Sequence, residues 1–167
     1  MMKGSILNTC LLTTLLAPVL ATAADLPSRK AGLWEITMTV AGLNMTQTVK
    51  QCIDAATDAK MLEMGKESQA QPGMKCTSGG PRKDGAGYVA ESSCSGNGTK
   101  MTTRSVFTGD FQSTYRSEST TKFTPPVSGF SEQKMTMDAH WKGPCEAGQR
   151  PGDMIMPGGI KMNIDSM

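Results

Sequence analysis

The side chains best suited to acid–base or nucleophilic chemistry are sparse in this chain. His140 is the only histidine, and a Ser-His-Asp triad would depend on it. The chain has no Gly-x-Ser-x-Gly sequence, the turn that presents a nucleophilic serine in many hydrolases. Asp54, Asp58 and Glu63 fall in one predicted helix, where carboxylates are most simply solvated surface. We therefore expect a protein that is not an enzyme, with an uncharacterised hydrolase as an alternative.

Methionine is the unusual residue type, with fourteen copies. Thioethers are soft ligands that suit Cu(I). Most of these methionines fit a core, but Met154, Met156 and Met162 lie in a Gly- and Pro-rich C-terminal stretch. We expect no cofactor, and keep a copper-binding protein that uses this stretch as an alternative.

The cysteines predict two disulfides. Cys10 lies in a predicted signal peptide, which leaves Cys52, Cys76, Cys94 and Cys145. No Cys-x-x-Cys pair is present, so neither a zinc ribbon nor a thioredoxin-like site is favoured. A hairpin closed symmetrically about Gly85 places Cys76 opposite Cys94 at disulfide distance, and Cys52 then pairs with Cys145 by exclusion.

The first 23 residues have the pattern of a cleaved export signal. Lys3 precedes an apolar stretch over 6–20, and Ala21-Thr22-Ala23 is a signal-peptidase site, so we expect cleavage after Ala23 and a periplasmic protein. The apolar stretch is shorter than the ~20 residues that span a bilayer, and no later stretch reaches that length. A formal net charge of +2 gives no electrostatic footprint for nucleic acid.

Alternating apolar and polar residues predict a mainly β protein. Predicted strands cover 34–40, 45–52, 75–77, 88–94, 99–107, 111–123 and 131–141, and Arg104, Arg116 and Lys122 should face solvent. Residues 54–65 form the one convincing helix, with Asp54 as its N-cap. A three-residue turn would pair Phe107 with Phe111. The strands should form an antiparallel up-and-down meander, curled into a sheet or partial barrel. Its predicted apolar face comprises Trp34, Ile36, Met38, Val40, Phe107, Phe111, Tyr115 and Trp141.

The predicted organisation is a signal peptide over 1–23, a single β-rich domain over 24–145, and a tail over 146–167. The tail is rich in Gly, Pro and Met and has no periodicity, so we expect it to be disordered.

Two short motifs and the cysteine pattern resemble a known family. Ala31-Gly32-Leu33-Trp34-Glu35-Ile36 opens the domain, and His140-Trp141-Lys142-Gly143-Pro144-Cys145 closes it. Together with the four cysteines, they resemble the bacterial exported-protein family called domain of unknown function 3617. The resemblance implies a periplasmic β-rich fold and no assigned activity.

The function expected from the sequence is binding. A curled meander often encloses a ligand cavity, so the partner is a small apolar molecule or another envelope protein. The residues of the apolar face could line such a cavity or form the core.

Overall fold

A computed structural model describes residues 25–67 and 73–166 of the 167-residue chain. The predicted signal peptide and its cleavage site fall outside the described residues. One α-helix, ten strands and two short 3-10 helices, Pro157–Gly159 and Ile164–Ser166, lie within them, which confirms the mainly β fold. The elements are β1 Gly32–Val40, β2 Met45–Ile53, α1 Ala55–Glu67, β3 Met74–Ser78, β4 Arg82–Asp84, β5 Gly87–Gly96, β6 Thr99–Gly109, β7 Thr114–Val127, β8 Phe130–Gly143, β9 Asp153–Ile155 and β10 Lys161–Asn163.

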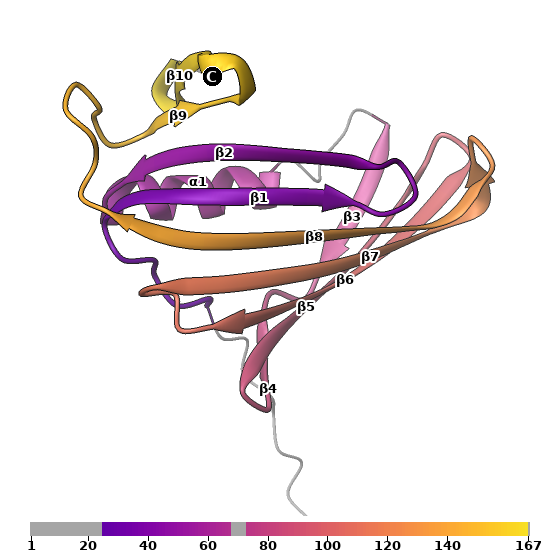
Figure 1. Ribbon diagram of the computed structural model, residues 1–167. Coiled ribbons are helices and arrows are strands. Elements are labelled where there is room, and N and C mark those ends of the chain that lie inside the picture. Colours follow the sequence, from indigo (N-terminus) through magenta and orange to yellow (C-terminus); the bar gives the residue numbers. More distant parts are fainter. Residues whose placement is uncertain (1–24, 68–72, 167) are drawn as a thin grey trace, which may run out of the picture.

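All ten strands belong to one antiparallel sheet with the order β10-β9-β2-β1-β8-β7-β6-β5-β3, and β4 also pairs with β5. The sheet is strongly twisted and curved but remains open, with helix α1 inside its curve behind β1 and β2 (Figure 1). Strands β5 to β8 are joined by short turns, as expected for a meander. β1 reaches β8 from the far end of the sequence, with Ile36 opposite Ala139. No helix in the described ranges is long and apolar enough to span a membrane.

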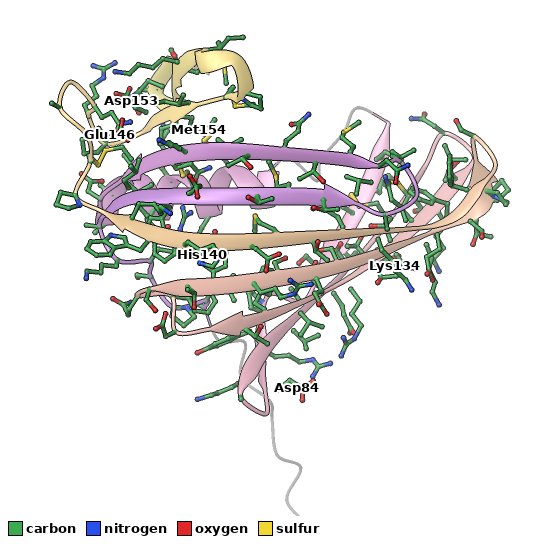
Figure 2. All side chains as sticks on the ribbon, in the orientation of Figure 1. Asp84, Lys134, His140, Glu146, Asp153 and Met154 are labelled. Atoms are coloured by element: carbon green, nitrogen blue, oxygen red, sulfur yellow. A yellow bond between two sulfur atoms is a disulfide. The ribbon has the colours of Figure 1, made fainter. Side chains whose placement is uncertain are left out.

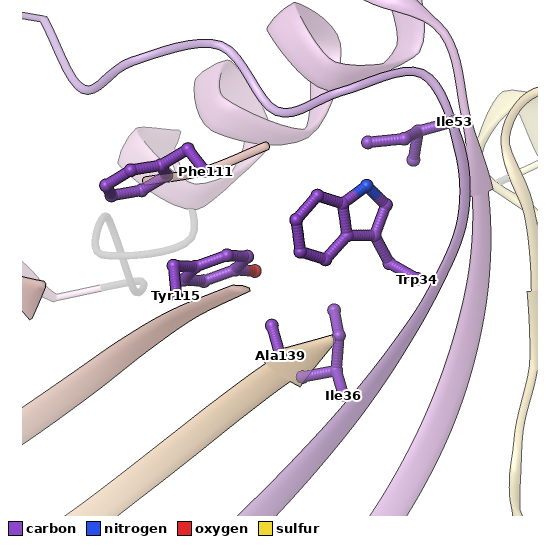
Figure 3. Close-up of a cluster of buried hydrophobic side chains, with 6 residues drawn as sticks. All are labelled: Trp34, Ile36, Ile53, Phe111, Tyr115 and Ala139. Carbon is purple, nitrogen blue, oxygen red and sulfur yellow. The ribbon is translucent and has the colours of Figure 1, made fainter. Parts of the chain in front are cut away.

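The core lies between α1 and one face of the sheet, which we call the inner face. Four inner-face residues of the neighbouring strands β1, β8 and β7 are buried: Trp34, Ile36, Ala139 and Tyr115. Ile53 and Phe111 complete this cluster (Figure 3). The Phe111 and Tyr115 rings stack with centroids 5.1 Å apart, and Trp34 packs at 5.5 Å from Tyr115. Apolar and polar residues therefore alternate along the strands because one face of the sheet is buried, as expected.

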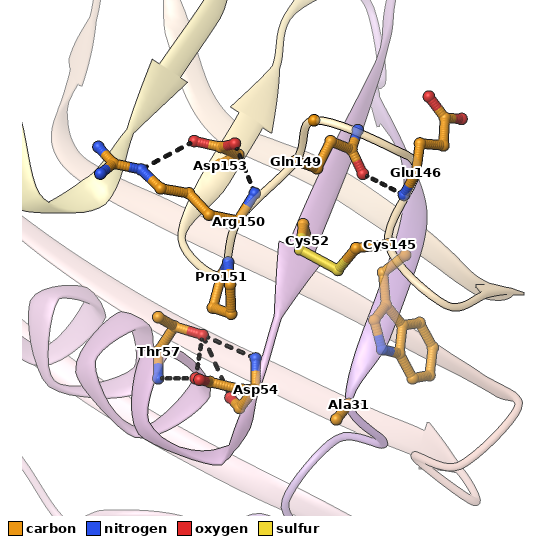
Figure 4. Close-up of a disulfide and its surroundings, with 12 residues drawn as sticks. Ala31, Cys52, Asp54, Thr57, Cys145, Glu146, Gln149, Arg150, Pro151 and Asp153 are labelled. Atoms are coloured by element: carbon orange, nitrogen blue, oxygen red, sulfur yellow. Dashed lines mark hydrogen bonds and ion pairs between the residues drawn. A yellow bond between two sulfur atoms is a disulfide. The ribbon is translucent and has the colours of Figure 1, made fainter.

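Both predicted disulfides are present. Cys76 and Cys94 are directly opposite each other in the β3–β5 ladder, as the hairpin symmetry required. Cys52 bonds Cys145 and fastens the end of β2 to the segment that follows β8 (Figure 4).

The turn around Phe111 differs from the sequence prediction. Phe111 is not a strand residue opposite Phe107, because Phe107 pairs with Ser117 and Phe111 sits in the turn with a φ of 57°. The Asp110 carboxylate fixes this turn: it accepts hydrogen bonds from the backbone N–H groups of Gln112, Ser113 and Thr114 and from the Ser113 hydroxyl. These bonds also hold the pKa of Asp110 well below its ordinary value.

The prediction of a disordered tail differs from the structure over 146–166. Strand β9 pairs with β2 and with β10, and Gly152 donates its N–H to the Cys52 carbonyl. The buried Asp153 carboxylate accepts from Asn163 and forms an ion pair with Lys161. Its hydrogen bonds from Asn163 and Lys161 hold the pKa of Asp153 well below its ordinary value. The order comes from these long-range contacts, which leave no periodic pattern in the sequence.

Candidate functional site

A cavity of about 350 Å³ lies between helix α1 and the inner face of the sheet. Its walls combine apolar side chains, four methionines and a small polar group. The apolar lining is Leu26, Pro27, Ile36, Leu62, Phe107, Phe111 and Ile164, the methionines are Met61, Met64, Met137 and Met154, and the polar residues are Arg29, Gln51, Asp58 and Tyr115. Small-molecule sites commonly have this composition and a volume of roughly 300–1,000 Å³.

Helix α1 begins at Ala55, directly after its capping residue Asp54. Asp54 accepts the N–H of Thr57 at 2.8 Å, and Thr57 Oγ1 accepts the N–H of Asp54 at 2.8 Å. This reciprocal arrangement confirms Asp54 as the N-cap. The bond from the Thr57 N–H is the main reason that the pKa of Asp54 is lowered. One turn further, Asp58, Met61 and Leu62 share the helix face that lines the cavity.

Asp58 is buried rather than solvated, contrary to the prediction from the sequence. Its side chain is 3% exposed and forms an ion pair with Arg29, whose side chain is 11% exposed. Asp58 Oδ1 accepts from Arg29 Nε at 2.7 Å, and Oδ2 accepts from the Arg29 backbone N–H at 2.8 Å. A carboxylate in an apolar region needs such a partner, and the first turn of a helix favours its negative charge.

Arg29 contacts the other three polar residues of the cavity, Gln51, Asp58 and Tyr115, and we call these four residues the polar corner. Arg29 Nη1 donates to Gln51 Oε1 at 3.1 Å and to the Tyr115 hydroxyl at 3.3 Å, and its Nη2 contacts Met61 Sδ at 3.4 Å. Burial raises the pKa of Tyr115, although the charge of Arg29 opposes this shift, so the phenol keeps its proton at neutral pH. Sequence reasoning missed Arg29, because its partner is in a distant helix and no periodicity marks the segment around it.

The segment before β1 contributes Leu26, Pro27 and Arg29 to the cavity lining. Lys30 donates its N–H to the Phe111 carbonyl, and Gln112 Nε2 donates to the Ser28 carbonyl. The Trp141 Nε1 donates to the Ala31 carbonyl, and the Lys30 ammonium lies 3.6 Å from the centroid of the Trp141 ring. These contacts hold Arg29 at the cavity from outside the strands.

Eleven of the fifteen residues that line the cavity lie between Arg29 and Cys145, and the same region matches a known family. The model of a family described as DUF3617, protein of unknown function, matches residues 29–145. The chain belongs to the DUF3617 family. No curated protein and no solved structure matches it. Arg29 is the first residue of the DUF3617 match, whereas Met154 and Ile164 line the cavity from beyond its end.

The predicted apolar face divides between core and cavity in this DUF3617 protein. Ile36, Phe107, Phe111 and Tyr115 line the cavity. Trp34 is fully buried beneath it, and three residues of the face are half-buried elsewhere on the inner face: Met38, Val40 and Trp141.

The methionines of the predicted copper site lie on and beside strands β9 and β10. Met154 and Met162 are opposite each other across β9 and β10, and Met154 Sδ accepts from Gln51 Nε2 at 3.7 Å. Met156 follows β9 and is half-buried. Within the described ranges, no group of three His, Cys, Asp or Glu side chains is placed to hold a metal ion.

His140 lies on the outer face of the sheet, away from the cavity (Figure 2). It is exposed, opposite Glu35 on β1 and Thr114 on β7, while its neighbours Ala139 and Trp141 belong to the inner face. Arg104, Arg116 and Lys122 are exposed, as expected.

Among the described residues, two hollows larger than this cavity differ from it in the side chains that line them. The larger one, about 920 Å³, is lined mainly by polar and charged side chains, such as Arg104 and Glu91, which are about half exposed. A second hollow of about 380 Å³ continues along the inner face from Phe107 toward Ala90 and Met101. Compared with these two hollows, the cavity beside α1 combines an apolar wall with a buried charge pair, so we take it as the candidate site.

Proposed function

We propose that this protein binds a small, largely apolar molecule in the cavity between α1 and the inner face of the sheet. The observation that carries this proposal is the pairing of an apolar wall with a few buried polar groups around Arg29. An apolar wall stabilises the bound molecule through the area removed from water, and buried polar groups orient it.

The proposed location is the periplasm. Its support is the signal-peptide pattern of the sequence together with two disulfides, because such bonds persist in oxidising compartments. The N-terminus of protein purified from its own cell should then begin at Ala24, and its mass should lie four protons below that of the reduced chain. A retained N-terminus or free thiols would contradict this location.

Displacement of a fluorescent apolar probe, aminoanthracene, tests the binding. Leu62→Trp adds a bulky ring at the cavity wall, and we expect it to weaken probe binding roughly tenfold or more. Leu43→Trp is the matched control, since Leu43 is 47% exposed, against 39% for Leu62, and lies in the β1–β2 turn away from the cavity. The control should bind the probe like the unmodified protein.

Two results would contradict the proposal: no saturable binding of the probe, or equal binding by both tryptophan variants. Native mass spectrometry of the periplasmic protein gives an independent reading, because a native mass above the denatured mass reveals a retained molecule. The size of the excess separates an organic ligand from copper, the alternative suggested by the methionines.

A further inference from the structure

The polar corner of the cavity has more hydrogen-bond donors than acceptors. Both Asp58 oxygens accept from Arg29, and Gln51 Oε1 and the Tyr115 oxygen accept from Arg29 Nη1. Each acceptor in contact with the guanidinium therefore already receives a hydrogen bond from it or from the Arg29 backbone.

Three donors at the same corner are poorly satisfied. Arg29 Nη2 and Gln51 Nε2 reach only the thioether sulfurs of Met61 and Met154, at 3.4 and 3.7 Å. Thioether sulfur is a weak acceptor. The Tyr115 hydroxyl receives a bond from Arg29, but its own proton has no acceptor among the described residues. A buried donor without a good acceptor costs free energy that a ligand acceptor can recover.

The charge at this corner is already balanced. Arg29 and Asp58 form a nearly buried pair with a net charge of zero. A ligand carboxylate would add an uncompensated negative charge next to Asp58 in an apolar cavity, which is unfavourable. A neutral carbonyl, such as that of an ester, would accept from the same donors without that penalty.

We propose that the ligand is a neutral amphipathic molecule, with an apolar body against α1 and a carbonyl-type acceptor bonded to the Tyr115 hydroxyl, beside Arg29 and Gln51. This inference rests on the proposed function and adds the chemical class of the ligand.

The test uses three probes of similar size: methyl hexanoate, hexanoate and heptane. Their affinities are measured by displacement of aminoanthracene from the full-length protein, Tyr115→Phe and Tyr88→Phe. Tyr115→Phe removes the hydroxyl and keeps the ring, and Tyr88→Phe is the control because Tyr88 is half-buried in β5 and does not line the cavity.

We expect Tyr115→Phe to weaken methyl hexanoate binding by roughly threefold to tenfold and to leave heptane binding unchanged. Tyr88→Phe should change neither the methyl hexanoate affinity nor the heptane affinity. Hexanoate at neutral pH should bind at least about tenfold more weakly than the ester. Heptane binding also reports that each variant is folded.

The outcomes separate the two proposals. If neither heptane nor the ester binds, the proposed function itself fails. If both bind but lose equal affinity in Tyr115→Phe, the cavity binds apolar molecules and the assignment of the acceptor is wrong. Tighter binding of hexanoate than of the ester would overturn the argument for a neutral head group.

Discussion

The disulfide between Cys52 and Cys145 joins residues 93 positions apart, whereas Cys76 and Cys94 are 18 apart. In the chain-entropy relation, closing the longer loop lowers the entropy of the unfolded chain more. The relation gives about 4.7 kcal/mol for Cys52–Cys145 and about 3.2 kcal/mol for Cys76–Cys94 at 25 °C. We therefore expect Cys52→Ala/Cys145→Ala to lose about 1.5 kcal/mol more unfolding free energy than Cys76→Ala/Cys94→Ala.

The comparison between the two pairs is informative because their other contributions are similar. Each bond has one buried cysteine, 0% exposed for Cys52 and 7% for Cys94, so the loss of packing largely cancels. Urea denaturation followed by circular dichroism gives both free energies. The variant without Cys52–Cys145 should also have the steeper dependence on urea, since its unfolded chain expands more.

Equal losses in the two variants, to within about 0.5 kcal/mol, would refute the loop-length reasoning. A larger loss for Cys76→Ala/Cys94→Ala would show that local anchoring of β3 outweighs loop entropy. An unchanged urea slope would indicate that the unfolded chain stays compact without the longer bridge.

Three other perturbations have defined outcomes. Arg29→Met should lower the unfolding free energy by about 3 kcal/mol because it leaves Asp58 buried without its partner. The double variant Arg29→Met/Asp58→Asn should lose less unfolding free energy than Arg29→Met and Asp58→Asn lose in sum. A loss in the double variant equal to that sum would contradict a coupled pair. The pKa values of Asp110 and Asp153 are lower in the folded than in the unfolded chain, so the stability they provide is present above about pH 4 and is lost as pH falls toward the folded values. Denaturation between pH 7 and pH 3 should show this loss, and Asp110→Asn should reduce its steepness; an identical pH profile would contradict the assignment. Gly32 has a φ of 130°, and an added Cβ would meet Trp141 Nε1 at 2.7 Å and the Gly143 carbonyl. Gly32→Ala should therefore cost about 2 kcal/mol or more, whereas Gly65→Ala, in helix α1 with open space around it, should stabilise by about 0.5–1 kcal/mol in thermal unfolding; similar effects of the two changes would refute the reasoning.

The sequence predicts well the features that depend on patterns within a short segment. Alternation of apolar residues in Trp34–Val40 marks β1, and the spacing about Gly85 correctly pairs Cys76 with Cys94. The Asp54 cap starts α1 within one residue of the predicted boundary. Each of these follows from a period or a spacing that a short window contains.

The candidate site could not be predicted in the same way. Arg29 and Asp58 each look like a solvated charge within their own segment, and only the fold brings them together. Met154 reaches the cavity because β9 pairs with β2, which places it opposite Gln51, 103 positions earlier in the chain. Polar and irregular segments carry little information on which distant element they meet.

The pairing of β1 with β8 has a consequence for how the chain folds. Strands β5 to β8 pair with sequence neighbours, so this part of the sheet can form through short loops. β1 must instead wait until Gly143 is available opposite Leu33, which requires closure of nearly the whole domain. During synthesis, the first hairpin emerges early with Trp34 still unburied, and its partner strand β8 emerges only after β3 to β7. The inner face of that hairpin is then the segment most exposed to aggregation before folding is complete.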